Sequence, residues 1–264
     1  MTSRAMPTTP MEAFFKSIPP TALRVLCSPR TLATVAQHLP FDCAAVLRYR
    51  SLPPLACVAR DPVRRIGYTS FRGYYRSIKM GVRFPYESLL ERDAMIVHDF
   101  HPWVRRFVAQ PVTLLYKREG RRRRYTPDLL VEPYEARPFF LEVRPHERTP
   151  GRLGPLLPHI QEAVVAFGCE HHFMDEHTIR AEPFFGNCRR ARRAARFLGD
   201  DHLLRLGEAL DRFPPPVDLG DLCWAVGQDD ALEQVLGLVA LGILSMRIDE
   251  DIRCGMVVFK GSNW

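Results

Sequence analysis

The order of apolar patterns along the chain predicts a mixed α/β protein with two structural regions. Over residues 63–180, a helical pattern is followed by several strand-like runs, a second helical pattern and one more strand, which is typical of an α/β sheet domain. Residues 181–264 form a second region, in which two helices and a hairpin are expected after the triple proline Pro214–Pro216. Residues 1–62 are rich in proline and form an N-terminal extension of unassigned role.

Each element of the sheet region follows from a local pattern. A helix is expected over residues 86–100, because apolar side chains recur at helical spacing and Pro102 stops it. A second helix is expected over residues 155–167, where apolar residues fall three to four positions apart. The expected strands are 107–109, 112–116, 125–131, 139–143 and 172–174.

The second region has the outline of a winged-helix module. Its pattern is helical from Asn187 until the triple proline, and helices are then expected over residues 219–226 and 232–241. Two short strands, 244–248 and 256–259, flank an acidic turn. A helix-turn-helix of this kind binds a DNA groove in some proteins and a protein partner in others.

Composition excludes several classes of protein. Of the 264 residues, 46% are apolar and 25% charged, which excludes a disordered chain. The seven cysteines are odd in number and include no Cys-x-x-Cys pair, which argues against a disulfide framework and a zinc ribbon. No apolar run approaches the roughly 20 residues of a membrane span. We therefore expect a cytoplasmic protein with no membrane partner, and, without a glycine-rich phosphate loop, no ATP hydrolysis.

Charge is distributed unevenly along the chain. The net charge is +7, but residues 63–150 carry 18 basic and 10 acidic residues, a net charge of +8. Residues 217–264 carry 3 basic and 8 acidic residues, a net charge of −5. The middle of the chain is therefore expected to face a polyanion, and the C-terminal part a protein partner.

Two dense basic runs are candidates for DNA contact. Residues 117–124 contain six basic residues around a glycine, and we expect this run to form the turn between strands 111–116 and 125–131. DNA contact is assigned to Arg121, Arg122, Arg123 and Arg124; a solvated loop without a partner is the alternative. The second run, residues 189–196, lies on a helical pattern and fits an exposed helix face as well as it fits DNA contact.

Two carboxylates in apolar strands form the strongest chemical signal. Asp128 and Glu142 are expected on adjoining strands, where an unpaired carboxylate is costly unless it binds a partner or a metal. Oxygen ligands suit Mg²⁺, which also binds phosphate and water. Arg144, two residues beyond Glu142, points to the same face of the sheet. The alternative is that both acids are ordinary strand residues.

Five motifs occur in a fixed order that resembles a known family. They are SIKM at 77–80, YESLLERD at 86–93, FVAQP at 107–111, YTPD at 125–128 and LEVRP at 141–145. In this order they resemble the TnsA-type transposon endonucleases, which have a restriction-endonuclease-like fold. The resemblance covers roughly residues 64–180 and continues more loosely into a C-terminal domain that the family builds as a winged helix.

The resemblance implies roles for individual residues. Glu91, Asp128 and Glu142 would hold the metal, which is Mg²⁺ or in its place Mn²⁺. Glu87, one turn before Glu91, competes for the same role. Arg144 stands where the family has lysine; it keeps the charge but not the compact ammonium, so the site is either working or weakened. Lys79 of the first motif is assigned to DNA.

The resemblance also implies a reaction and partners. The chain would hydrolyse one DNA strand at each transposon end, while a separate TnsB-type transposase cuts and joins the other strand. A TnsC-type ATP-dependent regulator would bind the assembly. Two alternatives remain: a catalytically weakened DNA-binding and scaffolding subunit, and a stand-alone restriction or repair nuclease.

Overall fold

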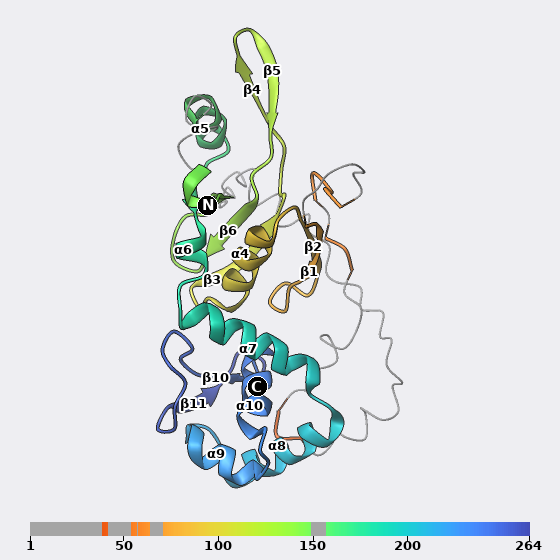
Figure 1. The fold of residues 1–264 in the computed structure, drawn as a ribbon, viewed down its shortest axis with the longest axis vertical. Coiled ribbons are helices and arrows are strands. Elements are labelled where there is room, and N and C mark those ends of the chain that lie inside the picture. The colour runs from red at the N-terminus through yellow and green to blue at the C-terminus, as the bar shows by residue number, and fades with distance from the viewer. Residues whose placement is uncertain (1–38, 42–53, 57, 64–70, 149–156) are drawn as a thin grey trace, which may run out of the picture. The chain divides into compact units, whose positions relative to one another are not determined.

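The computed structural model describes residues 39–41, 54–56, 58–63, 71–148 and 157–264. These residues fall into two compact units, one of which contains Leu55–Ile179 and the other Arg180–Trp264. Each unit contains both helices and strands, so the chain is a mixed α/β protein, as the sequence predicts (Figure 1). No helix in these described ranges is long and apolar enough to cross a membrane.

A four-stranded mixed sheet forms the centre of the first unit. Its strands are β3 (Val104–Ala109), β6 (Leu129–Pro133), β7 (Phe139–Val143) and β8 (Glu170–Met174), in the spatial order β3-β6-β7-β8. Strand β6 is antiparallel to both β3 and β7, whereas β8 is parallel to β7. A parallel connection needs a crossover, and α5 (Leu157–Ala166) lies in the crossover from β7 to β8. The short helix α6 (Glu176–Ile179) follows β8.

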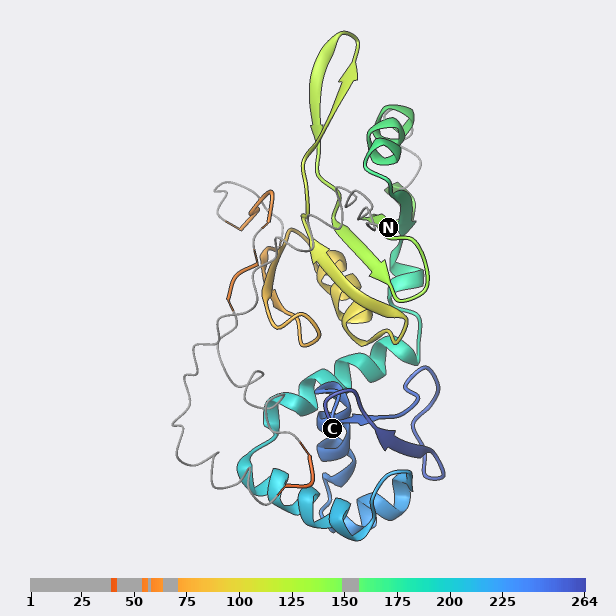
Figure 2. The same cartoon turned by 180° about the vertical axis from the view of Figure 1, so that it is seen from behind.

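Helix α4 (Leu89–Phe100) covers one face of this sheet and packs against β3 and β7; Figure 2 shows the sheet from behind. The helix begins three residues later than the sequence predicts. Tyr86 instead ends strand β2 (Arg83–Tyr86), which pairs with β1 (Gly73–Arg76). The N-cap is Ser88, whose hydroxyl oxygen accepts a hydrogen bond from the main-chain N–H of Glu91.

The expected strand over residues 125–131 is wrong, because the structure divides it into two elements. Strand β5 (Arg121–Tyr125) pairs with β4 (Leu114–Arg118), and a break at residues 126–128 precedes β6. The expected hairpin around Gly120 is confirmed, but its turn is shorter than predicted. Only Glu119 and Gly120, both with positive φ, separate β4 from β5, and four arginines lie in the second strand of the hairpin.

The second unit packs helices against a small sheet. The two helices and the two short strands predicted after the triple proline lie within one residue of their expected positions, except that the first strand ends at Ser245 instead of residue 248. The elements are α7 (Phe184–Phe197), α8 (Asp200–Arg212), β9 (Val217–Asp218), α9 (Leu219–Val226), α10 (Ala231–Ala240), β10 (Leu244–Ser245) and β11 (Val257–Lys260). Strand β11 lies between β10 and β9. Helix α10 packs closely against α7. A Cβ at Gly237 would lie 2.7 Å from Leu198 Cδ1, so a larger residue would push this buried leucine away.

Candidate active site

The structure brings the three predicted carboxylates together in the first unit. Glu91 lies in the first turn of α4, Asp128 lies directly before β6 and Glu142 lies on β7. The sequence predicts Asp128 inside a strand, which is wrong. Asp128 lies in the turn that leads into β6. Its main-chain oxygen accepts a hydrogen bond from Gln110 N at 2.9 Å, and its Oδ2 accepts one from Val143 N at 2.9 Å. These bonds fix the turn between the ends of β3 and β7.

Glu91 and Glu142 are buried and hydrogen-bonded by neighbouring groups. Glu142 is 2% exposed, and its Oε2 accepts a hydrogen bond from Tyr125 Oη at 2.6 Å while its Oε1 pairs with Arg144. Glu91 Oε2 accepts from Glu87 N at 2.9 Å and its Oε1 accepts from Ser88 Oγ at 3.0 Å. Together with the Ser88 N-cap, these bonds hold the start of α4, which gives Glu91 a structural role beside any chemical one.

The carboxylates destabilise one another's charge. Burial raises the pKa of Glu91 to about 7, and repulsion from Glu142 adds to the rise. The hydrogen bond from Ser88 acts in the opposite direction. Burial and repulsion from Glu142 and Glu91 raise the pKa of Asp128 well above its usual range. With all three carboxylates ionised, the site would carry more negative charge than Arg144 balances.

Arg144 follows the end of β7 and faces Glu142, as the two-residue spacing predicts. Its main-chain N–H donates to Met174 O at 3.0 Å, which anchors it to β8, and its guanidinium pairs with Glu142. Partial burial opposes the charge, but Glu142 and Asp128 outweigh it and raise the pKa of Arg144 above its usual value. The side chain therefore stays protonated and cannot act as a base.

Three residues near the carboxylates have no role in the sequence interpretation. Tyr125 Oη lies 2.6 Å from Glu142 Oε2 and 2.8 Å from Nε2 of His171 on β8. Burial raises the pKa of Tyr125 and lowers that of His171 to about 4, so the tyrosine keeps its proton and the histidine is neutral. Arg60 pairs with Glu87 and lowers the pKa of Glu91. Only Tyr125 could have been found from sequence, because it begins the YTPD motif.

Lys79 does not join this group. Its ammonium donates to the main-chain oxygens of His98 at 3.0 Å, His101 at 2.9 Å and Val104 at 2.6 Å. These oxygens lie at and beyond the C-terminal end of α4, where a cation is favourable. All three ammonium hydrogens are used, so Lys79 holds the helix end and has none left for phosphate. The assigned residues Arg121–Arg124 lie on β5 and are exposed.

The donor set of the site has the chemistry of a Mg²⁺ site. Within the described residues, no group of three or more His, Cys, Asp or Glu side chains is arranged to hold a metal ion. Both carboxylate oxygens of Glu91 and of Glu142 are instead hydrogen-bonded to protein donors. The three carboxylates nevertheless offer only oxygen donors, the type that a hard divalent cation prefers.

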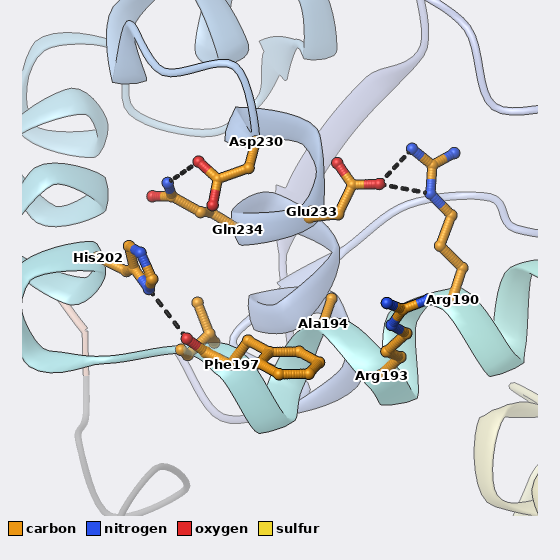
Figure 3. A pocket seen from close by; sticks show the side chains of 9 residues that line it. Arg190, Arg193, Ala194, Phe197, His202, Asp230, Glu233 and Gln234 are labelled. Carbon is orange, nitrogen blue, oxygen red and sulfur yellow. Dashed lines mark hydrogen bonds and ion pairs between the residues drawn. The ribbon is translucent and has the colours of Figure 1, made fainter.

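A separate pocket of about 600 Å³ lies in the second unit, between α7 and α10 (Figure 3). Its charged side chains are already paired. Arg190 donates to Glu233 Oε1 at 2.6 and 2.9 Å, and the Gln234 amide donates to Asp230 Oδ1 at 2.6 Å. Arg193 lies 5.9 Å from the ring centroid of Phe197. The second basic run is thus partly engaged with the protein itself.

Comparison of the whole chain with protein-family models finds no match, and neither does comparison with curated protein sequences. The functional argument therefore depends on the five sequence motifs and on the geometry of the carboxylate group.

Proposed function

We propose that the chain is a metal-dependent DNA endonuclease, the TnsA-type subunit of a heteromeric transposase. The observation that carries this proposal is the meeting of Glu91, Asp128 and Glu142 beside Arg144. The order of elements supports a restriction-endonuclease-like fold, since α4 and three antiparallel strands are followed by α5 and a parallel strand. These carboxylates come from α4, from the turn before β6 and from β7, so tertiary structure has assembled them.

In this proposal Glu91, Asp128 and Glu142 hold Mg²⁺, which Mn²⁺ can replace. When bound, the ion supplies Lewis-acid stabilisation of the phosphodiester and lowers the pKa of a bound water. Arg144 holds a phosphate oxygen, because a guanidinium binds phosphate through two parallel hydrogen bonds. Tyr125 orients Glu142 through its hydrogen bond, and neutral His171 in turn fixes the tyrosine hydroxyl.

The second unit is proposed as a winged-helix domain that binds the partner proteins. Its order of helix, strand, two helices and two strands supports that fold, with β9 antiparallel to β11. The net charge of −5 over residues 217–264 is unfavourable for DNA and leaves protein as the partner. Trp224 on α9 is 76% exposed, and exposed tryptophans are frequent anchors of protein interfaces. The partners would be a TnsB-type transposase and a TnsC-type ATP-dependent regulator.

A second candidate is a catalytically weakened subunit that binds DNA and supports the assembly. The ion pair between Arg144 and Glu142 favours this second candidate, because the pair occupies a carboxylate that a metal would need. The two candidates differ in one measurable property, which is hydrolysis of a phosphodiester.

The deciding experiment is a nicking assay on duplex DNA that carries a transposon end. The full chain is incubated with Mg²⁺ or Mn²⁺, with and without the TnsB-type transposase, beside the Asp128→Ala variant. The endonuclease proposal expects nicks that depend on the metal and on Asp128. Nicking without the transposase would indicate a stand-alone nuclease. An inert parent under every condition would leave the scaffolding role.

A further inference from the structure

The β4–β5 hairpin forms a two-stranded sheet of its own, separate from the four-stranded sheet (Figures 1 and 2). Its register places Leu115 opposite Arg124 and Lys117 opposite Arg122. Residues that are opposite each other in an antiparallel pair share a face, and residues two apart share it too. We call the face of Leu115, Lys117, Arg122 and Arg124 the outer face.

The other face, which we call the inner face, is directed to the body of the first unit. It carries Leu114, which is buried, and Tyr116, whose ring is 6.5 Å from His159 of α5. It also carries Tyr125, which donates to Glu142 in the carboxylate group. Arg123 lies on this inner face, opposite Tyr116. The outer face consequently points away from α5, and all four of its side chains are exposed, as are Arg121 and Arg123 on the inner face.

The outer face carries positive charge without compensation. Lys117 and Arg122 are directly opposite each other, and like charges in that position destabilise a strand pair. In the part of the chain that the structure describes, no acidic side chain forms an ion pair with any of Arg121–Arg124. A bound polyanion would supply the missing counter-charge and remove the repulsion.

We infer that the outer face of the β4–β5 hairpin binds in the major groove of duplex DNA. The major groove is about 12 Å wide and admits a two-stranded β-ribbon. Arg122 and Arg124 would reach base edges and phosphates, and Lys117 a phosphate, since these are the usual contacts of such side chains. The inference rests on the proposed function for its partner, and it adds which face reads that partner.

The hairpin also connects groove binding to the carboxylate group. Strand β5 ends at Tyr125, which is bonded to Glu142, and Asp128 follows three residues later. A duplex held by the outer face is therefore held by the strand that leads directly into the site. This contiguity gives the hairpin a positioning role as well as a binding role.

The test compares two double variants of the full chain with the same loss of charge. Arg122→Ala with Arg124→Ala removes the outer pair, and Arg121→Ala with Arg123→Ala removes two neighbours that alternate with it on β5. Binding to a 30-base-pair transposon-end duplex is measured in EDTA at several salt concentrations, so cleavage does not contribute. The outer variant should bind at least about 10-fold more weakly. Its log–log salt slope should be less steep by up to about 2, since each lost phosphate contact contributes about 0.9. The log–log salt slope of the control variant should change by less than a third of that amount.

Four results separate the inference from the proposed function. Equal losses in the two variants would mean that only total charge matters, which overturns the outer-face assignment. Equally tight binding of single-stranded DNA with the same losses would overturn the groove assignment. Normal binding by both variants, with metal-dependent nicking intact, would refute the inference and leave the nuclease proposal standing. A parent that binds no duplex would refute both, and far-ultraviolet circular dichroism checks that each variant is folded.

Discussion

Neutralising Glu91 should stabilise the folded protein at alkaline pH. The pKa of Glu91 is raised from 4.5 to about 7 by burial and by repulsion from Glu142, against the opposing hydrogen bond from Ser88. The folded protein therefore holds this proton more tightly than the unfolded chain does. The free energy of unfolding falls as the pH rises from about 4.5 to about 7, and Glu91→Gln removes this loss.

The size of the effect follows from the pKa difference. Since each pKa unit corresponds to about 1.4 kcal/mol, the charged form of Glu91 costs about 3 kcal/mol at pH 8. Most of this cost develops between pH 5 and pH 8. The glutamine has one acceptor oxygen where Glu91 uses two, so the variant loses about 1 kcal/mol of hydrogen bonding at both pH values. Glu91→Gln should be slightly less stable than the parent at pH 5 and about 2 kcal/mol more stable at pH 8.

Urea unfolding in EDTA measures this difference. The chain has three tryptophans, and only Trp103 belongs to the first unit. Replacing Trp224 and Trp264 by phenylalanine makes the fluorescence report that unit alone. The reasoning is refuted if the stability difference between Glu91→Gln and its parent changes by less than about 0.5 kcal/mol between pH 5 and pH 8.

Glu87→Gln is the matched control on the same stretch of chain. Glu87 is partly exposed and pairs with Arg60, so its neutralisation removes a partner rather than a repulsion. We expect a loss of up to about 1 kcal/mol at pH 8, opposite in sign to the effect at Glu91. A gain at Glu87 equal to that at Glu91 would mean that general charge reduction is the cause.

The remaining predictions concern activity, metal and partner binding. Asp128→Ala should abolish nicking while duplex affinity stays within about two-fold, because binding comes mainly from phosphate contacts made elsewhere; full nicking would remove Asp128 from the mechanism. Arg144→Ala should lower the nicking rate about 10²–10³-fold, as expected for one preformed charge-stabilising donor, and Arg144→Lys should retain activity; parental rates for both would leave Arg144 without a role. Mg²⁺ should stabilise the protein more at pH 8 than at pH 5 in thermal unfolding, because the ligands must be deprotonated. Trp224→Ala should weaken binding to the TnsB-type transposase by about 30-fold or more in calorimetry without changing duplex affinity; unchanged transposase binding would place the interface elsewhere.

The sequence predicts the elements whose surroundings are encoded locally. Strand β7 has the predicted bounds, Phe139–Val143, because four of its five residues are apolar, as is usual for a strand in the middle of a sheet. The hairpin is different, since four consecutive arginines in β5 have no strand-like pattern. Its inner face is held by the contact of Tyr116 with His159, which lies far away in sequence, so the local glycine predicts the hairpin but not how far its strands extend.

The site shows the same division between local and tertiary information. Glu91, Asp128, Glu142 and Arg144 are identified by motifs, and the structure brings all four together. His171 has no motif; it reaches Tyr125 because β8 pairs in parallel with β7, which places His171 opposite Phe140. For Lys79 the motif leads to a wrong assignment. A lysine within a motif suggests a phosphate contact, but the structure shows its ammonium bonded to three main-chain oxygens.

The cost of the carboxylate group is itself an argument about its function. Helix capping explains a glutamate at position 91, but it works equally well at an exposed helix start. It does not require that Glu91 be buried beside Glu142, where its pKa rises to about 7. The hydrogen bond from Val143 N to Asp128 likewise does not offset the effects that raise the pKa of Asp128. Stability alone would favour neutral side chains at these positions, since buried unbalanced charges are destabilising. Perturbed carboxyl groups that gather beside a permanent cation are instead typical of sites that bind metal or perform acid–base chemistry, which supports the proposed nuclease role of this group.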